Sequence, residues 1–222
     1  MPTTAVSGTE AGARRRRGAE TADRILDVAE QLFAERGYAG TSLREVAECV
    51  GVRIPSLYNH FSSKELLYAA VLERGIGPLL AMLSRFVSTG PAGGADPPRV
   101  MREVMRWLVQ HPALPRLVLH ETLSGGQRLT PMLRRWIAPT FARAQELVEV
   151  SPAARRWKAE QIPLLVIAMY HVVVGYFAIA PLYEELGGHD LMAAEAVERQ
   201  TRFLCDLVGA LFELPPEPER NA

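Results

Sequence analysis

The chain has 222 residues, of which 48% are hydrophobic and 23% charged, and 25 basic residues balance 25 acidic ones. This is the profile of a globular protein with one large or two small apolar cores, and it excludes a disordered, collagen-like or disulfide-stapled chain. Cys49 and Cys205 are far apart in the sequence, which indicates free thiols. Because the first residues lack the apolar segment of a secretory signal, a cytoplasmic location is expected.

The net charge of zero conceals an uneven distribution of charge. Four consecutive arginines, Arg14 to Arg17, lie in a stretch rich in Gly, Ala, Ser and Thr, so residues 1–19 are expected to form a disordered basic arm. Between residues 20 and 64, in contrast, seven acidic residues outnumber five basic ones. If that segment binds a nucleic acid, it must use individually placed charges rather than a general positive field.

Apolar residues recur with the period of an α-helix along almost the whole chain, so the predicted fold class is all-α. We expect a three-helix domain at 20–66, a larger helical domain at 67–213 and a disordered tail at 214–222. The first helices are predicted at 22–36, 43–50 and 54–61, with Thr21 and Ser42 as N-caps, and the next begins at Lys64 after Ser62 or Ser63. Beyond a loop at 88–98, helices are predicted at 99–111, 113–123, 131–150, 159–184 and 191–213.

Residues 41–61 have the pattern of a helix-turn-helix. Ala47 is small enough for two short helices to cross closely, and Gly51 accepts the positive φ that the turn requires. A small core beneath the motif is expected from Val46, Val50, Leu57 and Phe61.

The second helix of this motif has an outer face that suits DNA. With Leu57 pointing inwards, a rotation of about 100° per residue places Pro55, Ser56 and Asn59 on the outside. Tyr58 and His60 fall on the two flanks, where a helix in the major groove meets the phosphate backbones.

Short motifs follow one another from Arg24 to Leu67: Arg24-Ile-Leu, Leu32-Phe, Gly37-Tyr, Gly40-Thr-Ser-Leu, Val46-Ala, Gly51-Val, Ser56-Leu-Tyr-Asn-His-Phe61 and Lys64-Glu-Leu-Leu67. Together they resemble the DNA-binding domain of the TetR family of bacterial transcriptional regulators. The resemblance implies phosphate contacts from the hydroxyls of Thr41 and Ser42, backbone clamps from Tyr58, His60 and Lys64, and base reading by Ile54, Pro55, Ser56 and Asn59.

Two basic features near this domain have more than one interpretation. Arg53 stands where the family often has a small polar or capping residue, so it either weakens the start of the helix or contacts DNA itself. The arginines at 14–17 either enter an adjacent minor groove or form a non-specific, solubilising tail.

The larger domain contains an unusually apolar helix. Residues 162–183 include no Asp, Glu, Lys or Arg, which is compatible with a membrane span or with a helix buried on one side in its own domain and on the other in a partner. The last helix adds an apolar stripe, and the resemblance implies a homodimer formed by these two helices. The interface is predicted to include His171, Val174, Val197, Phe203, Leu204, Leu207, Val208 and Leu211.

The resemblance also implies a small-molecule effector held among the middle helices. The candidate pocket residues are aromatic or polar side chains within apolar helices, which favour a hydrophobic effector. They are Trp107, His111, His120, Trp136, Phe141, Met169, Tyr170 and Phe177.

The predicted function is a homodimeric, ligand-responsive regulator, a repressor that leaves a palindromic double-stranded DNA operator when the effector binds. A helical enzyme with an accessory DNA-binding domain is one alternative, but the sequence shows no catalytic signature, metal-ligand spacing or cofactor motif, so no catalytic residue, metal or cofactor is expected. A membrane-associated sensor built on residues 162–183 is the other alternative.

Overall fold

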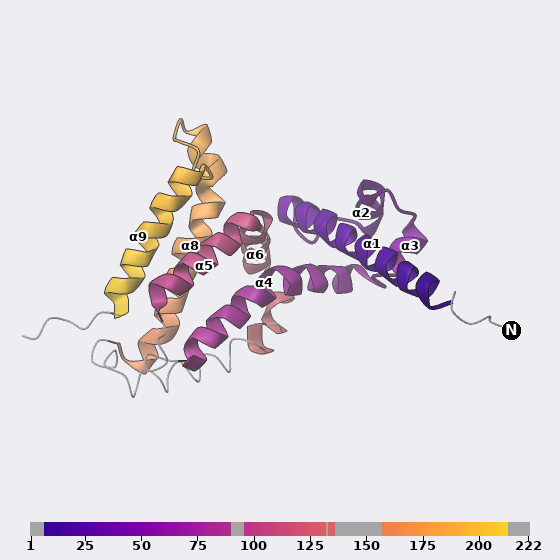
Figure 1. The fold of residues 1–222 in the computed structure, drawn as a ribbon. Helices are drawn as coiled ribbons and strands as arrows, with labels where there is room; N and C mark the ends of the chain where they lie inside the picture. The colour runs from indigo at the N-terminus through magenta and orange to yellow at the C-terminus, as the bar shows by residue number, and fades with distance from the viewer. Residues whose placement is uncertain (1–6, 90–95, 132, 136–156, 213–222) are drawn as a thin grey trace, which may run out of the picture. The chain divides into compact units, whose positions relative to one another are not determined.

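A computed structural model describes residues 7–89, 96–131, 133–135 and 157–212. This part of the chain consists of helices and turns without a strand, which confirms the predicted all-α class (Figure 1). The chain divides into two compact units, Met1–Arg74 and Gly75–Ala222. The boundary therefore falls inside a helix after Arg74, and not after residue 66 as predicted.

The first unit contains α1 (Ser7–Arg36), α2 (Leu43–Val50), α3 (Ile54–Tyr58) and the beginning of α4 (Lys64–Thr89). The inward residues predicted for the helix-turn-helix are buried, except that Phe61 is only partly buried. Fully or almost fully buried side chains in this unit include Ile25, Ala29, Phe33, Val46, Ala47, Leu57, Leu67, Tyr68, Val71 and Leu72.

The helix α1 is longer than the sequence analysis predicted. It begins at Ser7, so the expectation of a disordered arm is wrong for residues 7–19, while residues 1–6 lie outside the described part. Ala, Arg and Glu are good helix formers, and a helix already nucleated in a core extends without a second nucleation cost. Thr21 consequently lies inside α1 and is not its N-cap; its hydroxyl donates to the carbonyl of Arg17 at 2.8 Å.

The second unit contains the remainder of α4, α5 (Pro97–Gln110), α6 (Ala113–Leu123), a short 3₁₀ helix (Ala159–Gln161), α8 (Ile162–Glu185) and α9 (Ala194–Phe212). Within it α5 packs against α9, and α6 packs against α8. Residues 129–131 and 133–135 are helical, but most of the helix predicted at 131–150 and the tail at 214–222 lie outside the described residues.

Gly75 allows the helices of the second unit to approach α4 closely. A β-carbon at this position would lie 2.6 Å from Cδ1 of Leu114, which is far inside van der Waals contact. The Gly75 carbonyl also accepts a hydrogen bond from the Trp107 indole at 3.0 Å.

The helix α9 faces its own protomer more than the sequence predicted. Leu204 and Val208, both predicted in the dimer interface, are buried within the protomer, so the prediction is wrong for these two residues. The reason is that α9 turns this side towards α5. Phe203 remains exposed, while Val197, Leu207 and Leu211 are partly exposed.

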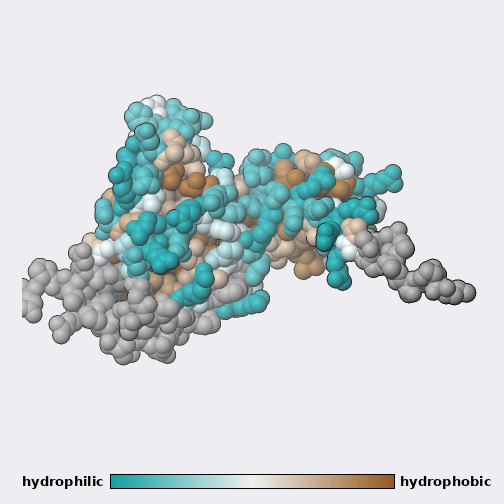
Figure 2. Space-filling view, in the orientation of Figure 1, coloured by the Kyte–Doolittle hydropathy of each residue, from teal (hydrophilic) through white to brown (hydrophobic). Residues whose placement is uncertain are grey.

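The helix α8 has one buried and one exposed apolar face. Ile162, Val173, Phe177 and Ala180 are buried. At about 100° per residue, the opposite side is an exposed stripe, which we call the α8 stripe: Leu164, Ile167, His171, Val172, Ile179, Leu182, Tyr183 and Leu186. Val174, another predicted interface residue, is partly exposed. Hydrophobic residues reach the surface in the region of α8 and α9 (Figure 2).

Two of the described helical segments are long and apolar enough to cross a membrane, Lys64–Phe86 and Ile162–Glu185. Their most apolar windows are 39% and 11% buried, respectively. The second helix thus leaves more of its apolar surface exposed than the first, and exposed apolar surface of this kind is typical of interaction sites.

The contrast between buried and exposed leucines predicts unequal costs of truncation. Leu204→Ala removes a side chain that is 0% exposed and is expected to lower the free energy of unfolding by about 2–5 kcal/mol. Leu123 is 78% exposed, so Leu123→Ala is expected to change the free energy of unfolding by at most about 0.5 kcal/mol. Urea unfolding of both variants measures the difference, and equal costs would contradict the placement of Leu204 in the core.

Candidate nucleic-acid interface

The first unit has an open groove between the start of α2, α3 and the start of α4. Five of the residues predicted to bind DNA contribute to it: Thr41, Ser42, Ile54, Tyr58 and Lys64. The other lining residues are Ala39, Leu43, Arg44, Ser62, Ser63 and Glu65. The groove is thus rich in hydroxyl groups, which are common donors to DNA phosphates.

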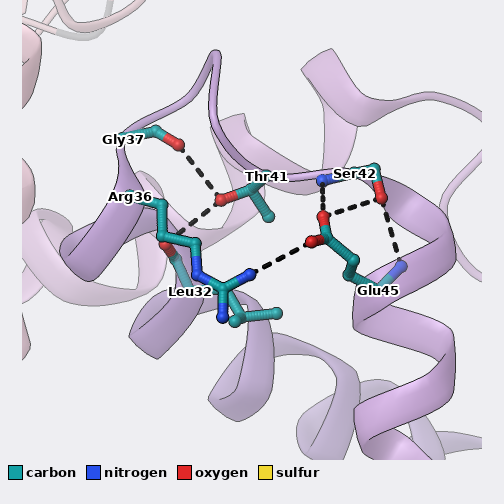
Figure 3. A network of polar contacts seen from close by, with 6 residues as sticks. All are labelled: Leu32, Arg36, Gly37, Thr41, Ser42 and Glu45. Atoms are coloured by element: carbon teal, nitrogen blue, oxygen red, sulfur yellow. Dashed lines mark hydrogen bonds and ion pairs between the residues drawn. The ribbon is translucent and has the colours of Figure 1, made fainter.

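The start of α2 is fixed by a capping box, as Figure 3 shows. The backbone N–H of Glu45 donates to Oγ of Ser42 at 3.2 Å, and the Ser42 backbone N–H donates to the Glu45 carboxylate at 2.8 Å. Arg36, at the end of α1, joins the same carboxylate at 3.0 Å. The predicted N-cap role of Ser42 is therefore confirmed, and the cap is tied to the preceding helix.

The hydrogen bonds of the cap also set the charge state of Glu45. The Ser42 side chain and backbone hold the pKa of Glu45 below its ordinary value, and the nearby charges of Arg36 and Lys64 lower that pKa further. The carboxylate is ionised at neutral pH and gives the α2 N-terminus the negative charge that its dipole favours.

Thr41 has a different role from the one predicted. Its side chain is only 2% exposed, and its hydroxyl lies 3.1 Å from each of the carbonyl oxygens of Leu32 and Gly37. The expected phosphate contact by the Thr41 hydroxyl is therefore wrong, because that group satisfies carbonyls at the end of α1 (Figure 3).

The turn after α2 has the geometry that the sequence predicted. Gly51 adopts φ 75°, in the left-handed region, and its N–H donates to the carbonyls that end α2. Arg24 donates to the Val50 carbonyl at 2.7 Å and so ties the end of α2 to α1. The direction in which α3 leaves the turn is fixed by these bonds.

The helix α3 presents the predicted outer face. Leu57 is fully buried, whereas Pro55, Tyr58 and Asn59 are exposed. The helix proper ends at Tyr58 rather than at residue 61, and a turn with N–H bonds to the Leu57 carbonyl follows. Ser56, Ile54 and His60 are partly buried.

Arg53 is exposed and makes no side-chain cap for α3, as its residue type predicts. It does not line the groove, and neither do Pro55, Ser56, Asn59 and His60. The structure thus separates the predicted residues into groove-lining ones and ones on the outer face of α3 and the turn after it.

The start of α4 is held against the end of α1 by ring and charge contacts. The Lys64 ammonium lies 4.2 Å from the centre of the Tyr38 ring, and the Tyr38 hydroxyl donates to Glu65 at 2.5 Å. Ser63 caps the helix by accepting from the Leu66 N–H at 3.2 Å. These contacts place Lys64 on the rim of the groove.

Arg44 and Tyr38 also belong to this region and were not predicted from the sequence. Arg44 lines the groove from the first turn of α2, two residues after the cap, and its position next to a predicted phosphate-binding serine was the available signal. Tyr38 was quoted only as part of a motif, and nothing in the sequence indicates that it supports Lys64.

Comparison with known proteins identifies the fold and the family. Residues 25–71 match the model described as bacterial regulatory proteins of the tetR family, and residues 98–208 match the tetracyclin repressor-like C-terminal domain. The chain belongs to the TetR family. The two matched segments lie entirely within the first and the second compact unit, respectively.

Curated relatives match parts of this TetR-family chain. The transcriptional repressor KstR2 of Rhodococcus jostii is 38% identical over 66 residues, which are 30% of this chain and 32% of KstR2. The activator FasR of Mycolicibacterium smegmatis is 39% identical over 70 residues, 32% of each chain, and the repressor AcnR of Corynebacterium diphtheriae is 30% identical over 139 residues, 60% of each. The matches thus span about a third of KstR2 and FasR.

Solved structures resemble more of the chain. A putative transcriptional regulator from Streptomyces coelicolor aligns with 88% of this chain and 99% of its own length, with a TM-score of 0.62 and 23% sequence identity. At this identity, the likeness supports the TetR fold of both units.

In the second unit of the TetR-family chain, several of the predicted pocket residues that the structure describes make local contacts. Trp107 stacks on His111 with ring centres 4.0 Å apart, and the Tyr170 hydroxyl lies 3.1 Å from that of Thr122. Met169 and His120 are partly exposed, whereas Trp136 and Phe141 lie outside the described residues.

A cleft of about 310 Å³ lies elsewhere in this unit. Of the predicted pocket residues only Phe177 lines it, together with Pro112, Arg116, Ala180, Pro181, Glu184, Asp190 and Met192. Three charged side chains make this cleft more polar than the expected effector chamber.

Acid is expected to open the α2 cap. Because the pKa of Glu45 is lowered, its stabilising effect is complete above the ordinary value of 4.5 and is lost as the pH falls through the lowered pKa. Glu45→Gln keeps an acceptor for the Ser42 N–H but carries no charge, so it should lose less stability over that range. Urea unfolding of both proteins in steps from pH 7 to below pH 4.5 tests this, and parallel losses would contradict it.

Proposed function

We propose that this protein is a cytoplasmic, homodimeric regulator of transcription that binds a palindromic DNA operator and leaves it when a small effector binds. The observation that carries the proposal is the hydroxyl-rich groove beside the outer face of α3. Membership of the TetR family supports it. KstR2 and AcnR are named repressors, so repression is the proposed sign.

In this proposal, α3 lies in the major groove and its flanks contact the phosphates. Ile54 and Pro55 suit the methyl group of thymine, and Asn59 can form two hydrogen bonds with adenine. Tyr58, His60, Lys64 and Ser42 contact the DNA backbone, and Arg53 is placed to contact DNA at the start of α3. Few positive charges are available, so shape and neutral hydrogen bonds carry much of the recognition.

A single short α3 reads too few base pairs to select a site, so two copies are needed. The exposed α8 stripe supplies an apolar surface for a two-fold contact, because the same stripe on a second copy is complementary to it. A lipid bilayer is the competing partner for this stripe, and it would leave the isolated protein insoluble without detergent.

Two leucines with similar exposure test the dimer. Leu182 lies in the α8 stripe and is 50% exposed, whereas Leu66 is 56% exposed and lies in the first unit. Leu182→Glu is expected to convert the dimer to folded monomers in sedimentation, because it buries a charge at the contact, and Leu66→Glu should leave the dimer intact. A Leu182→Glu protein that still sediments as a dimer would refute the α8 interface.

Tyrosine hydroxyls offer a similar comparison for DNA binding. Tyr58 and Tyr183 are 48% and 43% exposed, respectively, and each loses only its hydroxyl on change to Phe. Tyr58→Phe is expected to weaken operator binding by about 1 kcal/mol per hydrogen bond lost, and Tyr183→Phe should not. The operator affinity is measured by titration at several salt concentrations. Equal affinities of the Tyr58→Phe variant and the wild type would show that the Tyr58 hydroxyl does not contact DNA.

Selection of bound duplexes from random DNA tests the whole proposal. A palindromic consensus with two half-sites is the expected result, and loss of any enrichment would overturn DNA recognition. A reporter gene placed behind the consensus then gives the sign of regulation, since the activator FasR is also a relative.

The effector acts in this proposal by shifting a population. It releases DNA only if it binds the DNA-incompetent dimer more tightly than the bound one. We propose a hydrophobic effector, which the family resemblance and the apolar middle helices support. Apolar compounds screened for release of the operator complex test it, and compounds that bind the protein without lowering DNA affinity would speak against this role.

A further inference from the structure

Four of the five arginines between residues 20 and 74 bind partners within the first unit. Arg36 pairs with Glu45, Arg44 pairs with Glu48 at 2.9 Å, and Arg74 pairs with both Asp27 and Glu30 at 2.8 Å. Arg24 is bound to the carbonyl of Val50. These guanidinium groups stabilise the fold and are not simply available to phosphates.

If one of these arginines left its carboxylate partner to bind a DNA phosphate, the net electrostatic attraction between the protein and DNA would increase little. An exposed pair such as Arg44–Glu48 contributes at most about 1 kcal/mol and can open easily. The carboxylate that it releases, however, stays beside the arginine and repels the phosphate. Between residues 20 and 64 acidic residues already outnumber basic ones, so a DNA-binding unit of this kind needs positive charge from outside this segment.

The first turns of α1 hold such charge. Arg15, Arg16 and Arg17 lie in a helix that begins at Ser7, and Ile25 is the first buried residue among the side chains that the structure describes there. All three arginines are exposed, and their side chains form no ion pair with the described residues. The segment before Ile25 is about 27 Å long, and Figure 1 shows this end of α1 extending past α3.

We propose that this N-terminal extension of α1 is a second DNA-contacting element, which binds the phosphate backbone beside the operator as a helix. The proposal rests on the DNA-binding function proposed above and adds a distinct source of affinity to it. The extension supplies the electrostatic attraction that the folded motif lacks, while α3 and the groove supply the sequence preference.

The helical form limits the number of contacts. Consecutive residues on a helix point about 100° apart, so Arg15, Arg16 and Arg17 spread over about 200° and at most two of them face one surface. We therefore expect one or two phosphate contacts from these residues in each protomer. Each contact contributes about 0.9 to the slope of log K against log salt concentration.

Replacement of the three arginines tests the charge. The triple variant Arg15→Gln, Arg16→Gln and Arg17→Gln is expected to bind a random-sequence duplex about 10-fold more weakly at low salt, with a slope smaller by about 1–2 per protomer. The matched variant with lysine at these three positions keeps the positive charge, so it should retain both the affinity at low salt and the salt slope. An unchanged slope in the glutamine variant would overturn the proposal.

Replacement of Gly18 tests the helix. A β-carbon at Gly18 has nothing within 4 Å, so alanine fits and raises the ratio of helix to coil about 5-fold. Gly18→Ala should tighten binding by up to that factor, and Gly18→Pro should weaken it because it breaks the helix. Tighter binding by the proline variant, or equal binding by both, would show that the extension does not bind as a helix and would overturn this part.

The two proposals fail in different ways. If the duplex selection gives no consensus while the three-glutamine variant still loses affinity for random DNA, the extension is supported and the operator function fails. If a palindrome is selected equally well by the wild type and the three-glutamine variant at equal affinity, the operator function stands and the extension proposal fails. A wild-type protein that binds neither duplex overturns both.

Discussion

The polar contacts at the junction of α1 and α2 determine where the rest of the first unit lies. Thr41 satisfies carbonyls at the end of α1, Ser42 begins α2, and Glu45 joins the cap to Arg36. Because backbone groups at helix ends need partners, these bonds fix both helix ends at once. The orientation of α2, together with the turn at Gly51, then sets the direction of α3. The shape of the groove therefore depends on hydrogen bonds and an ion pair within the protein, made by Thr41, Ser42, Glu45 and Arg36.

The sequence allowed good prediction of the helix-turn-helix because its signals are local. A serine followed three residues later by a glutamate predicts a cap, a glycine predicts the left-handed turn, and apolar spacing assigns the inward side of α3. Ser42, Gly51 and Leu57 all occupy the predicted positions. The family resemblance over the same segment is confirmed by the match at residues 25–71.

Other features depend on distant contacts and could not be predicted in this way. A threonine next to a helix start can bind phosphate or the preceding helix, and only the fold shows that Thr41 does the latter. An all-apolar helix gives no sign of which face is buried, so the α8 stripe appeared only once α6 was placed against α8. Similarly, Leu204 looked suited to an interface until α9 was seen to pack on α5.

The different exposure of the two free thiols allows one natural cysteine to be labelled selectively. Cys49 is exposed on α2, whereas Cys205 is buried and its Sγ donates to the Pro98 carbonyl at 3.3 Å. A thiol-specific spin label should therefore attach selectively to α2 of the native protein. In a two-fold dimer, the two labels form one symmetric pair, whose dipolar coupling gives a distance between the two helix-turn-helix motifs. Movement of those motifs is thus measurable without altering a single residue.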